Sequence, residues 1–109
     1  MSRTLRILQR AQADVDAIFD WLVPRSLQGA IAWYLSLRRA VEQIALTPER
    51  FPLARESHLL GREIHETLFK TRRGRLYRIL FEFSDAEIVL LRVRGPGQRP
   101  LRRRDLPSE

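Results

Sequence analysis

Arginines in the second half of the chain are the residues best suited to chemistry. Three of them fall in two segments of alternating apolar and polar residues, 76–83 and 89–94, and four more follow within ten residues. A guanidinium group stays protonated and can bind a phosphate or a carboxylate through two parallel N–H bonds. The pattern therefore predicts an anion-binding or target-binding surface made of Arg78, Arg92, Arg94, Arg99, Arg102, Arg103 and Arg104.

Other kinds of chemistry have few candidate residues. The chain has no cysteine, which excludes disulfides and thiolate ligands. Its two histidines, His58 and His65, are too few to indicate a metal site, and we expect no metal or cofactor. Tyr77 and His65 fall in segments that resemble strands, where a core or ordinary strand role competes with acid–base work.

The two alternating segments predict a β-hairpin in which arginines face each other. Period-two alternation of aromatic and branched residues indicates half-buried antiparallel strands. Matching their apolar faces puts Arg78 opposite Arg94, and like charges in that position destabilise a sheet unless an anion or a carboxylate is near. Either Arg78 binds an external anion, or it pairs with Glu66 or Glu82. The expected apolar pairs are Ile79 with Val93, Phe81 with Leu91 and Phe83 with Val89.

The first half of the chain predicts one strand and a pair of helices. Residues 4–9 alternate as a strand, and 11–23 carry apolar residues at helical spacing until Pro24. A second helical stripe covers 26–47, with Trp33 off the stripe and expected to be partly exposed. Because only 23–26 join them, the helices should form an antiparallel hairpin. Prolines 48 and 52 break the following connector, which leads into a strand at 65–71.

This order predicts an α+β domain of two layers, β-α-α-β-β-β, with the helical hairpin packed on a mainly antiparallel sheet. We expect residues 1–95 to form the domain and 96–109 to form a loose basic tail. The second sheet face should carry the strand arginines together with Leu76, Leu80 and Leu90. No remaining predicted element is long enough to cover that face, which favours a binding surface.

The charge and the length of the chain restrict its possible partners and location. The 109 residues suit one domain. The net charge is +7, and it is concentrated between Lys70 and Arg104, where the sequence has eleven basic residues and three acidic ones. This asymmetry favours a nucleic acid or an acidic protein as partner, although solubility and an arginine-rich genome offer a plainer explanation. No apolar run approaches the roughly 20 residues of a membrane helix. Without an export signal, we expect a cytoplasmic protein.

Three motifs, taken in their order along the chain, resemble those of the RelE/ParE superfamily of type II toxins. They are ADVDAIFDW early in the chain, AVEQIALTPERFP at the end of the second helix, and RGRLYRILFEFSDAEIVLLRVR across the hairpin. The resemblance implies one of two activities. RelE-like members cleave mRNA on the ribosome, using basic residues and a His or Tyr near the C-terminus. ParE-like members, of the plasmid-stabilisation type, poison DNA gyrase and lack that chemistry.

Carried over residue by residue, the resemblance gives an incomplete nuclease site. The family's strand arginine falls on Arg78, a later arginine on Arg99, and the preceding basic pair is kept only near Lys70. The usual histidine after the last strand is replaced by Arg94-Gly95, and no tyrosine follows Tyr77. Since arginine stays protonated, it serves poorly as acid or base. These departures favour a ParE-like gyrase inhibitor. A RelE-like endoribonuclease using Arg78, Arg99 and Lys70, or a basic binding module without toxicity, are the alternatives.

The resemblance also implies a cognate antitoxin and a toxin–antitoxin hetero-oligomer. The C-terminal segment of the antitoxin should wrap the toxin and cover the exposed sheet face or the helical hairpin with an amphipathic, acidic stretch. The expected contacts are Leu76, Leu80, Leu90 and Trp33.

Overall fold

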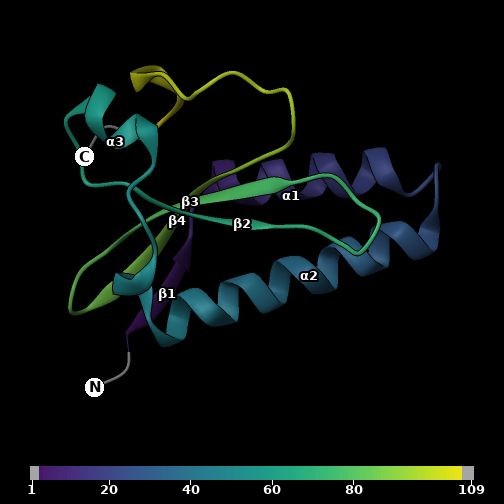
Figure 1. Cartoon of the computed structure of the whole chain (residues 1–109), viewed down its shortest axis with the longest axis horizontal. Coiled ribbons are helices and arrows are strands. Elements are labelled where there is room, and N and C mark those ends of the chain that lie inside the picture. Colours follow the sequence, from purple (N-terminus) through teal and green to yellow (C-terminus); the bar gives the residue numbers. More distant parts are fainter. Residues whose placement is uncertain (1–2, 107–109) are drawn as a thin grey trace.

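A helical hairpin covers one face of a four-stranded sheet, and shorter segments cover the other face (Figure 1). The computed structural model describes residues 3–106; residues 1–2 and 107–109, including the end of the expected tail, lie outside the described residues. The elements are β1 (Thr4–Ile7), α1 (Gln9–Leu22), α2 (Leu27–Leu46), α3 (Arg55–Leu60), β2 (His65–Phe69), β3 (Tyr77–Phe83) and β4 (Glu87–Arg94), with 3-10 turns η1 (Pro48–Arg50) and η2 (Arg103–Asp105). The α+β class and the hairpin are confirmed.

Local signals explain where the longer helix α2 begins and ends. Ser26 is the N-cap of α2, and its Oγ accepts a hydrogen bond from the Gly29 N–H at 2.9 Å, which satisfies a donor that the first helical turn leaves free. Pro48 follows the end of α2 and starts η1.

No helix among residues 3–106 combines the length and apolar character needed to cross a membrane.

The sheet order is β1-β4-β3-β2, with β1 parallel to β4 and the other pairs antiparallel. This order puts β1 at an edge. β1 pairs only with residues 87–90 of β4, so the last part of β4 extends beyond it. All four residues of β1 are exposed.

The pairing of β3 with β4 differs from the expected register at one end. Arg78 lies opposite Arg94 and Ile79 opposite Val93, as predicted. The register then shifts between Leu80 and Phe81, so that Phe81 pairs with Leu90 and Phe83 with Ile88; the expected pairs with Leu91 and Val89 were wrong. The short 84–86 loop aligns Phe83 with Ile88, and one extra residue in β4 absorbs the difference as a β-bulge.

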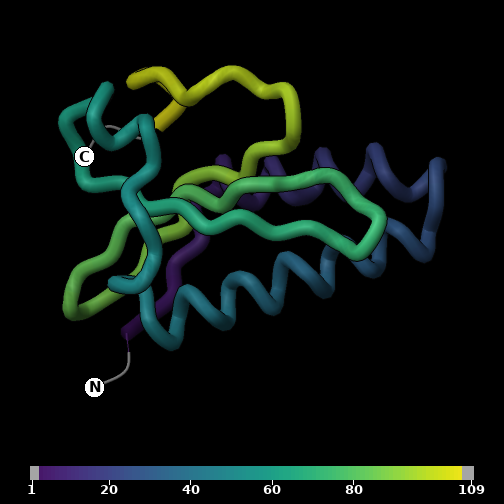
Figure 2. The backbone as a smooth tube through the Cα atoms, viewed as in Figure 1, coloured from purple at the N-terminus to yellow at the C-terminus, as the bar shows by residue number. Residues whose placement is uncertain are grey.

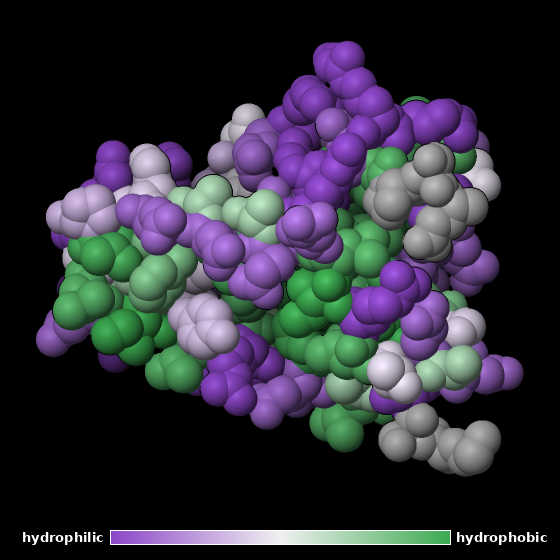
Figure 3. Space-filling model, turned by 180° about the vertical axis from the view of Figure 1, so that it is seen from behind, coloured by the Kyte–Doolittle hydropathy of each residue, from purple (hydrophilic) through white to green (hydrophobic). Residues whose placement is uncertain are grey.

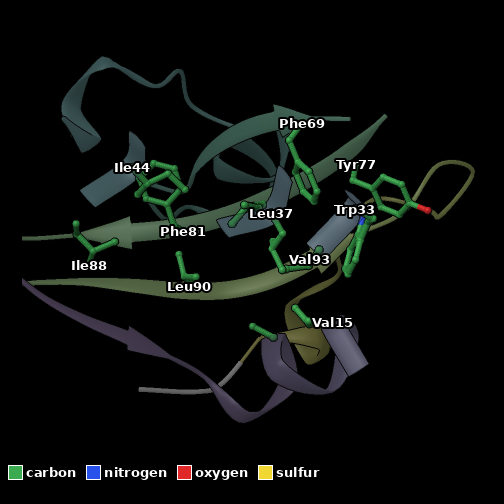
Figure 4. Packing of buried hydrophobic residues seen from close by; sticks show 12 residues of the cluster. Val15, Trp33, Leu37, Ile44, Phe69, Tyr77, Phe81, Ile88, Leu90 and Val93 are labelled. Carbon is green, nitrogen blue, oxygen red and sulfur yellow. The ribbon is translucent and has the colours of Figure 1, made fainter. Parts of the chain in front are cut away.

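The bulge changes which side chains face the helices. Leu90 joins Phe81 and Val93 in the core under α1 and α2, where it is 3% exposed (Figure 4). The expectation that Leu90 lies on the opposite face was therefore wrong. Trp33 also belongs to this core: it is 2% exposed, between Phe69 and Tyr77 at ring-centroid distances of 6.0 and 5.5 Å, so the expected partial exposure was wrong.

The second sheet face is covered, contrary to expectation. Leu80 on this face is 0% exposed. Residues from α3 and from the C-terminal segment 96–106, which runs beside α3 in Figure 2, form a second core over it. The described part of the expected loose tail is thus packed, with Leu101 and Leu106 buried at 3% and 5% exposure. This core contains Ala54, Leu60, Ile64, Leu80, Val89, Leu91, Leu101 and Leu106.

The helix α3 was missing from the sequence prediction. It spans only six residues in a connector that prolines 48 and 52 interrupt, so no helical stripe of useful length marks it. Gly61 ends it with φ of 66°, in the left-handed region that glycine adopts without steric cost.

Candidate functional site

The strand arginines of the predicted surface, Arg78, Arg92 and Arg94, lie on the sheet face that α3 and the C-terminal segment cover. Arg78 of β3 is bound by two carboxylates. Its guanidinium donates to both oxygens of Glu56 at 2.6 and 3.1 Å, and its Nε donates to Glu66 Oε1 at 2.8 Å. Burial alone would lower the pKa of Arg78, but the two carboxylates outweigh burial and raise it. Arg78 is therefore already supplied with anionic partners from within the chain.

Glu56 is the centre of this arrangement. Glu56 is 0% exposed, and its Oε2 also accepts a hydrogen bond from the backbone N–H of Leu101 at 3.1 Å. Burial would raise the pKa of Glu56, yet the hydrogen bonds from Arg78 and from the Leu101 N–H hold it below its ordinary value. One carboxylate on α3 thus joins β3 to the C-terminal segment.

Arg92 of β4 is likewise neutralised inside the fold. It donates to both oxygens of Asp14 on α1 at 2.7 and 2.9 Å and to the Asp105 carbonyl at 3.1 Å. Asp14 also accepts the Val93 N–H at 2.9 Å. β1 ends before this part of β4, so Asp14 supplies the acceptor that a neighbouring strand would otherwise provide.

Arg94 and Arg99 are held by the C-terminal segment. Arg94 is 7% exposed and donates to the Arg99 carbonyl at 2.9 Å, while its Nε is without a partner among the described residues. Burial, and then the charge of Arg92, lower the pKa of Arg94. Arg99 itself forms a two-bonded pair with Asp105 at 2.7 and 3.2 Å, which keeps the pKa of that carboxyl well below its usual range.

Of the predicted anion-binding arginines, only the C-terminal run is open to solvent as a group. Arg102, Arg103 and Arg104 are exposed on η2 and the residue before it. By contrast, Arg78, Arg92 and Arg99 meet carboxylates that the sequence did not identify as a set. Glu56 and Glu66 bind Arg78, Asp14 binds Arg92, and Asp105 binds Arg99.

Two residues capable of acid–base chemistry, Tyr77 and His65, lie on the helix side of the sheet, away from these arginines. Tyr77 is 8% exposed on the helix side of the sheet, and burial raises the pKa of its hydroxyl. His65 is also buried, with its Nδ1 2.8 Å from the Phe51 carbonyl and its ring stacked near Phe81. His58 is exposed on α3. Lys70 is exposed directly after β2.

A second feature is an apolar groove between β1, α1 and α2. It encloses about 310 Å³. Its walls include Leu5 and Ile7 of the edge strand and Tyr34 of α2, each between 40% and 46% exposed. Arg38 and Glu42 also line it. Seen from behind relative to Figure 1, the molecule shows apolar residues in its middle with hydrophilic ones around them (Figure 3).

Comparison with known protein families decides the class of the protein. The family model described as the ParE toxin of the type II toxin–antitoxin system parDE matches residues 5–100. The chain belongs to the ParE toxin family.

One solved structure similar to this ParE-family toxin is the crystal structure of the toxin–antitoxin complex RelBE2 from Mycobacterium tuberculosis. The identity is 23%, the match covers 87% of this chain and 99% of that chain, and the TM-score is 0.44. No curated protein matches the chain.

Family membership confirms the resemblance to type II toxins that the three sequence motifs indicated. The matched region also extends into the C-terminal segment, as far as residue 100. The family's toxins belong to toxin–antitoxin systems, so a cognate antitoxin is the expected partner of this ParE-family toxin.

Proposed function

We propose that this toxin inhibits DNA gyrase by binding it and does not cleave RNA. The observation that carries this proposal is the state of the sheet arginines. In a metal-free ribonuclease, a base must accept the 2′-hydroxyl proton and an acid must protonate the leaving oxygen. Here Arg78 is bound to two carboxylates, and both Tyr77 and His65 are buried on the other side of the sheet.

The test is a supercoiling assay with purified toxin and gyrase, run beside an mRNA cleavage assay on translating ribosomes. We expect inhibition of supercoiling, with cleaved DNA trapped on gyrase, and no cut mRNA. An excess of the antitoxin should reverse the inhibition. Ribosome-dependent mRNA cuts that disappear in Arg78→Gln would instead support the RelE-like alternative.

We also infer that the antitoxin occupies the apolar groove between β1, α1 and α2. The other sheet face is already covered by α3 and residues 96–106, whereas the groove offers an open apolar surface beside the helical hairpin that the predicted amphipathic segment can use. Leu80, Leu90 and Trp33 are buried and do not offer antitoxin contacts on the surface; Leu76 is 49% exposed.

A charge placed in the groove tests this inference. Ile7→Glu should weaken antitoxin binding by roughly 30-fold or more, because a carboxylate would be desolvated where an apolar side chain is expected to dock. Leu59→Glu, at a residue that is 64% exposed on α3, is the matched control and should leave affinity unchanged. Binding is measured by isothermal titration calorimetry, after circular dichroism has shown both variants to be folded. Equal affinities for the two variants would exclude the groove.

A further inference from the structure

The loop between β2 and β3 carries a cluster of positive charge with no acidic residue beside it in the sequence. From Thr67 to Phe81 the sequence has five basic residues and no acidic one. Four of them, Lys70, Arg72, Arg73 and Arg75, are exposed, and no ion pair or side-chain hydrogen bond engages them among residues 3–106. Unlike the sheet arginines, they are therefore available to an external anion.

The fold brings an exposed tryptophan to the same end of the molecule. In Figure 1 the β2–β3 loop and the turn between α1 and α2 lie at the same end of the long axis. Trp21, in the last turn of α1, is 54% exposed, and the Arg25 guanidinium lies 3.7 Å from its ring centroid. Asp20 is the neighbouring carboxylate in that turn.

A pocket of about 370 Å³ connects the two features. Ala17, Ile18 and Trp21 of α1 form one wall, and Arg75, Tyr77 and Pro96 belong to the facing side. Gly95 also lies on that side, close enough to Tyr77 that a methyl group on its α-carbon would be 3.4 Å from the ring. The pocket is thus mostly apolar, and it is bordered by the Arg75 guanidinium, which has no ion-pair partner among residues 3–106.

This combination fits a single strand of nucleic acid. Proteins that bind single strands pair a cationic path for the phosphates with aromatic rings on which unpaired bases stack. We propose that this end of the toxin binds single-stranded nucleic acid, with phosphates along residues 70–75 and one base in the Trp21 pocket. Duplex DNA keeps its bases stacked inside and cannot fill the pocket. The proposal does not depend on whether gyrase is the target.

The test uses the full chain and a fluorescein-labelled oligo(dT) of about 12 nucleotides, a length within the usual range for such sites. Fluorescence anisotropy at about 50 mM salt gives the affinity, because phosphate contacts weaken as salt rises. Arg72→Gln/Arg73→Gln should bind at least about tenfold more weakly and show a flatter salt dependence, by roughly 1.4 in the log–log slope. The matched control is Arg50→Gln/Arg55→Gln, which removes the same charge from exposed positions on η1 and α3 and should bind as wild type.

The base pocket is tested separately through Trp21. Trp21→Ala should lose roughly five- to a hundredfold in affinity for oligo(dT), the range measured for one stacked base, whereas Trp21→Phe should retain most of it. The only other tryptophan, Trp33, is buried, so oligo(dT) should quench the emission of wild type and not that of Trp21→Phe.

Three outcomes would overturn the proposal. The first is no binding of oligo(dT) to wild type at low salt. The second is unchanged binding by Trp21→Ala, which would leave a plain anion patch without a base site. The third is competition by poly-glutamate of equal charge as effective as that by unlabelled oligo(dT), which would assign the surface to an acidic protein.

Discussion

Glu56 acts on its surroundings through three bonds at once. It accepts two hydrogen bonds from Arg78 and one from the Leu101 N–H, while its own residue has no exposed surface. Removing one partner of a buried ion pair leaves the other charge desolvated and unpaired, which costs more than the pair itself contributes. Glu56 should therefore stabilise this face more than any exposed carboxylate on the same connector.

We predict that Glu56→Gln lowers the free energy of unfolding by about 3 kcal/mol at pH 7. Glu63→Gln, at a side chain that is 77% exposed, should change it by less than about 0.5 kcal/mol. Urea denaturation followed by circular dichroism measures both. A loss for Glu56→Gln no larger than that for Glu63→Gln would contradict the role assigned to Glu56.

The same pair predicts a dependence on pH. Because the folded-state pKa of Glu56 lies below its ordinary value of 4.5, its contribution is complete above that pH and is lost as pH falls through the folded pKa. The difference in stability between wild type and Glu56→Gln should therefore be constant from pH 7 to about 5 and should shrink below about 4.5. Urea midpoints across this range measure it; a constant difference down to about pH 3 would be contrary to expectation.

Among the elements, the C-terminal segment forms part of the fold and is not an appendage. Leu101 and Leu106 lie in the second core with Leu80 of β3 and Leu60 of α3. Burying leucines from this segment offsets the entropy of ordering a chain that has little regular structure of its own. The segment in turn positions Asp105 against Arg99 and Glu56 against the backbone of Leu101.

We predict that Leu101→Ala reduces the free energy of unfolding by roughly 2–3 kcal/mol, because it removes buried methyl groups and leaves a cavity. Leu59→Ala, in the exposed part of α3, should stay within about 0.5 kcal/mol of wild type. Chemical denaturation gives both values, and limited proteolysis should release residues after 95 faster in Leu101→Ala. Equal stabilities would mean that the segment is not anchored by Leu101.

Over the whole molecule, the positive charge separates into neutralised and free groups. Arg78 and Arg92 are paired with Glu56, Glu66 and Asp14, whereas groups of exposed basic residues without such partners among residues 3–106 lie in the β2–β3 loop and at η2. Charges free of internal partners steer and bind external anions, whereas buried pairs mainly shape the fold. These two ends are therefore the places to look for contacts with a target.

We predict that replacing Arg102, Arg103 and Arg104 with glutamine leaves stability within about 0.5 kcal/mol of wild type, because all three side chains are exposed. If the run contacts the gyrase complex, as the sequence suggests, the concentration for half-inhibition of supercoiling should rise several-fold, with the larger effect at low salt. Arg50→Gln/Arg55→Gln serves again as the control. Unchanged inhibition by the triple variant would remove the run from the target-binding surface.

Local patterns in the sequence were sufficient to predict the fold class, the helical hairpin, the β3–β4 hairpin with Arg78 facing Arg94, and the toxin family. Each of these depends on periodicity within one segment or on short motifs in order. Even the need for an acidic partner at Arg78 followed from the register, with Glu66 named as one candidate. These are short-range properties that neighbouring residues set together.

The residues that pack on the second sheet face, by contrast, are determined by contacts between segments far apart in the sequence. A β-bulge of one residue places Leu90 in the helix-side core, and the periodicity of the sequence does not predict such a bulge. Glu56, on the six-residue α3, reaches Arg78 across 22 positions and Leu101 across 45. Pairings of that kind arise when distant segments compete to bury the same apolar surface and to satisfy the same charges. That competition turned the strand arginines of a predicted open surface into an internal network. It left the β2–β3 loop, with Trp21 at the same end of the molecule, and the arginines at η2 as the exposed cationic regions.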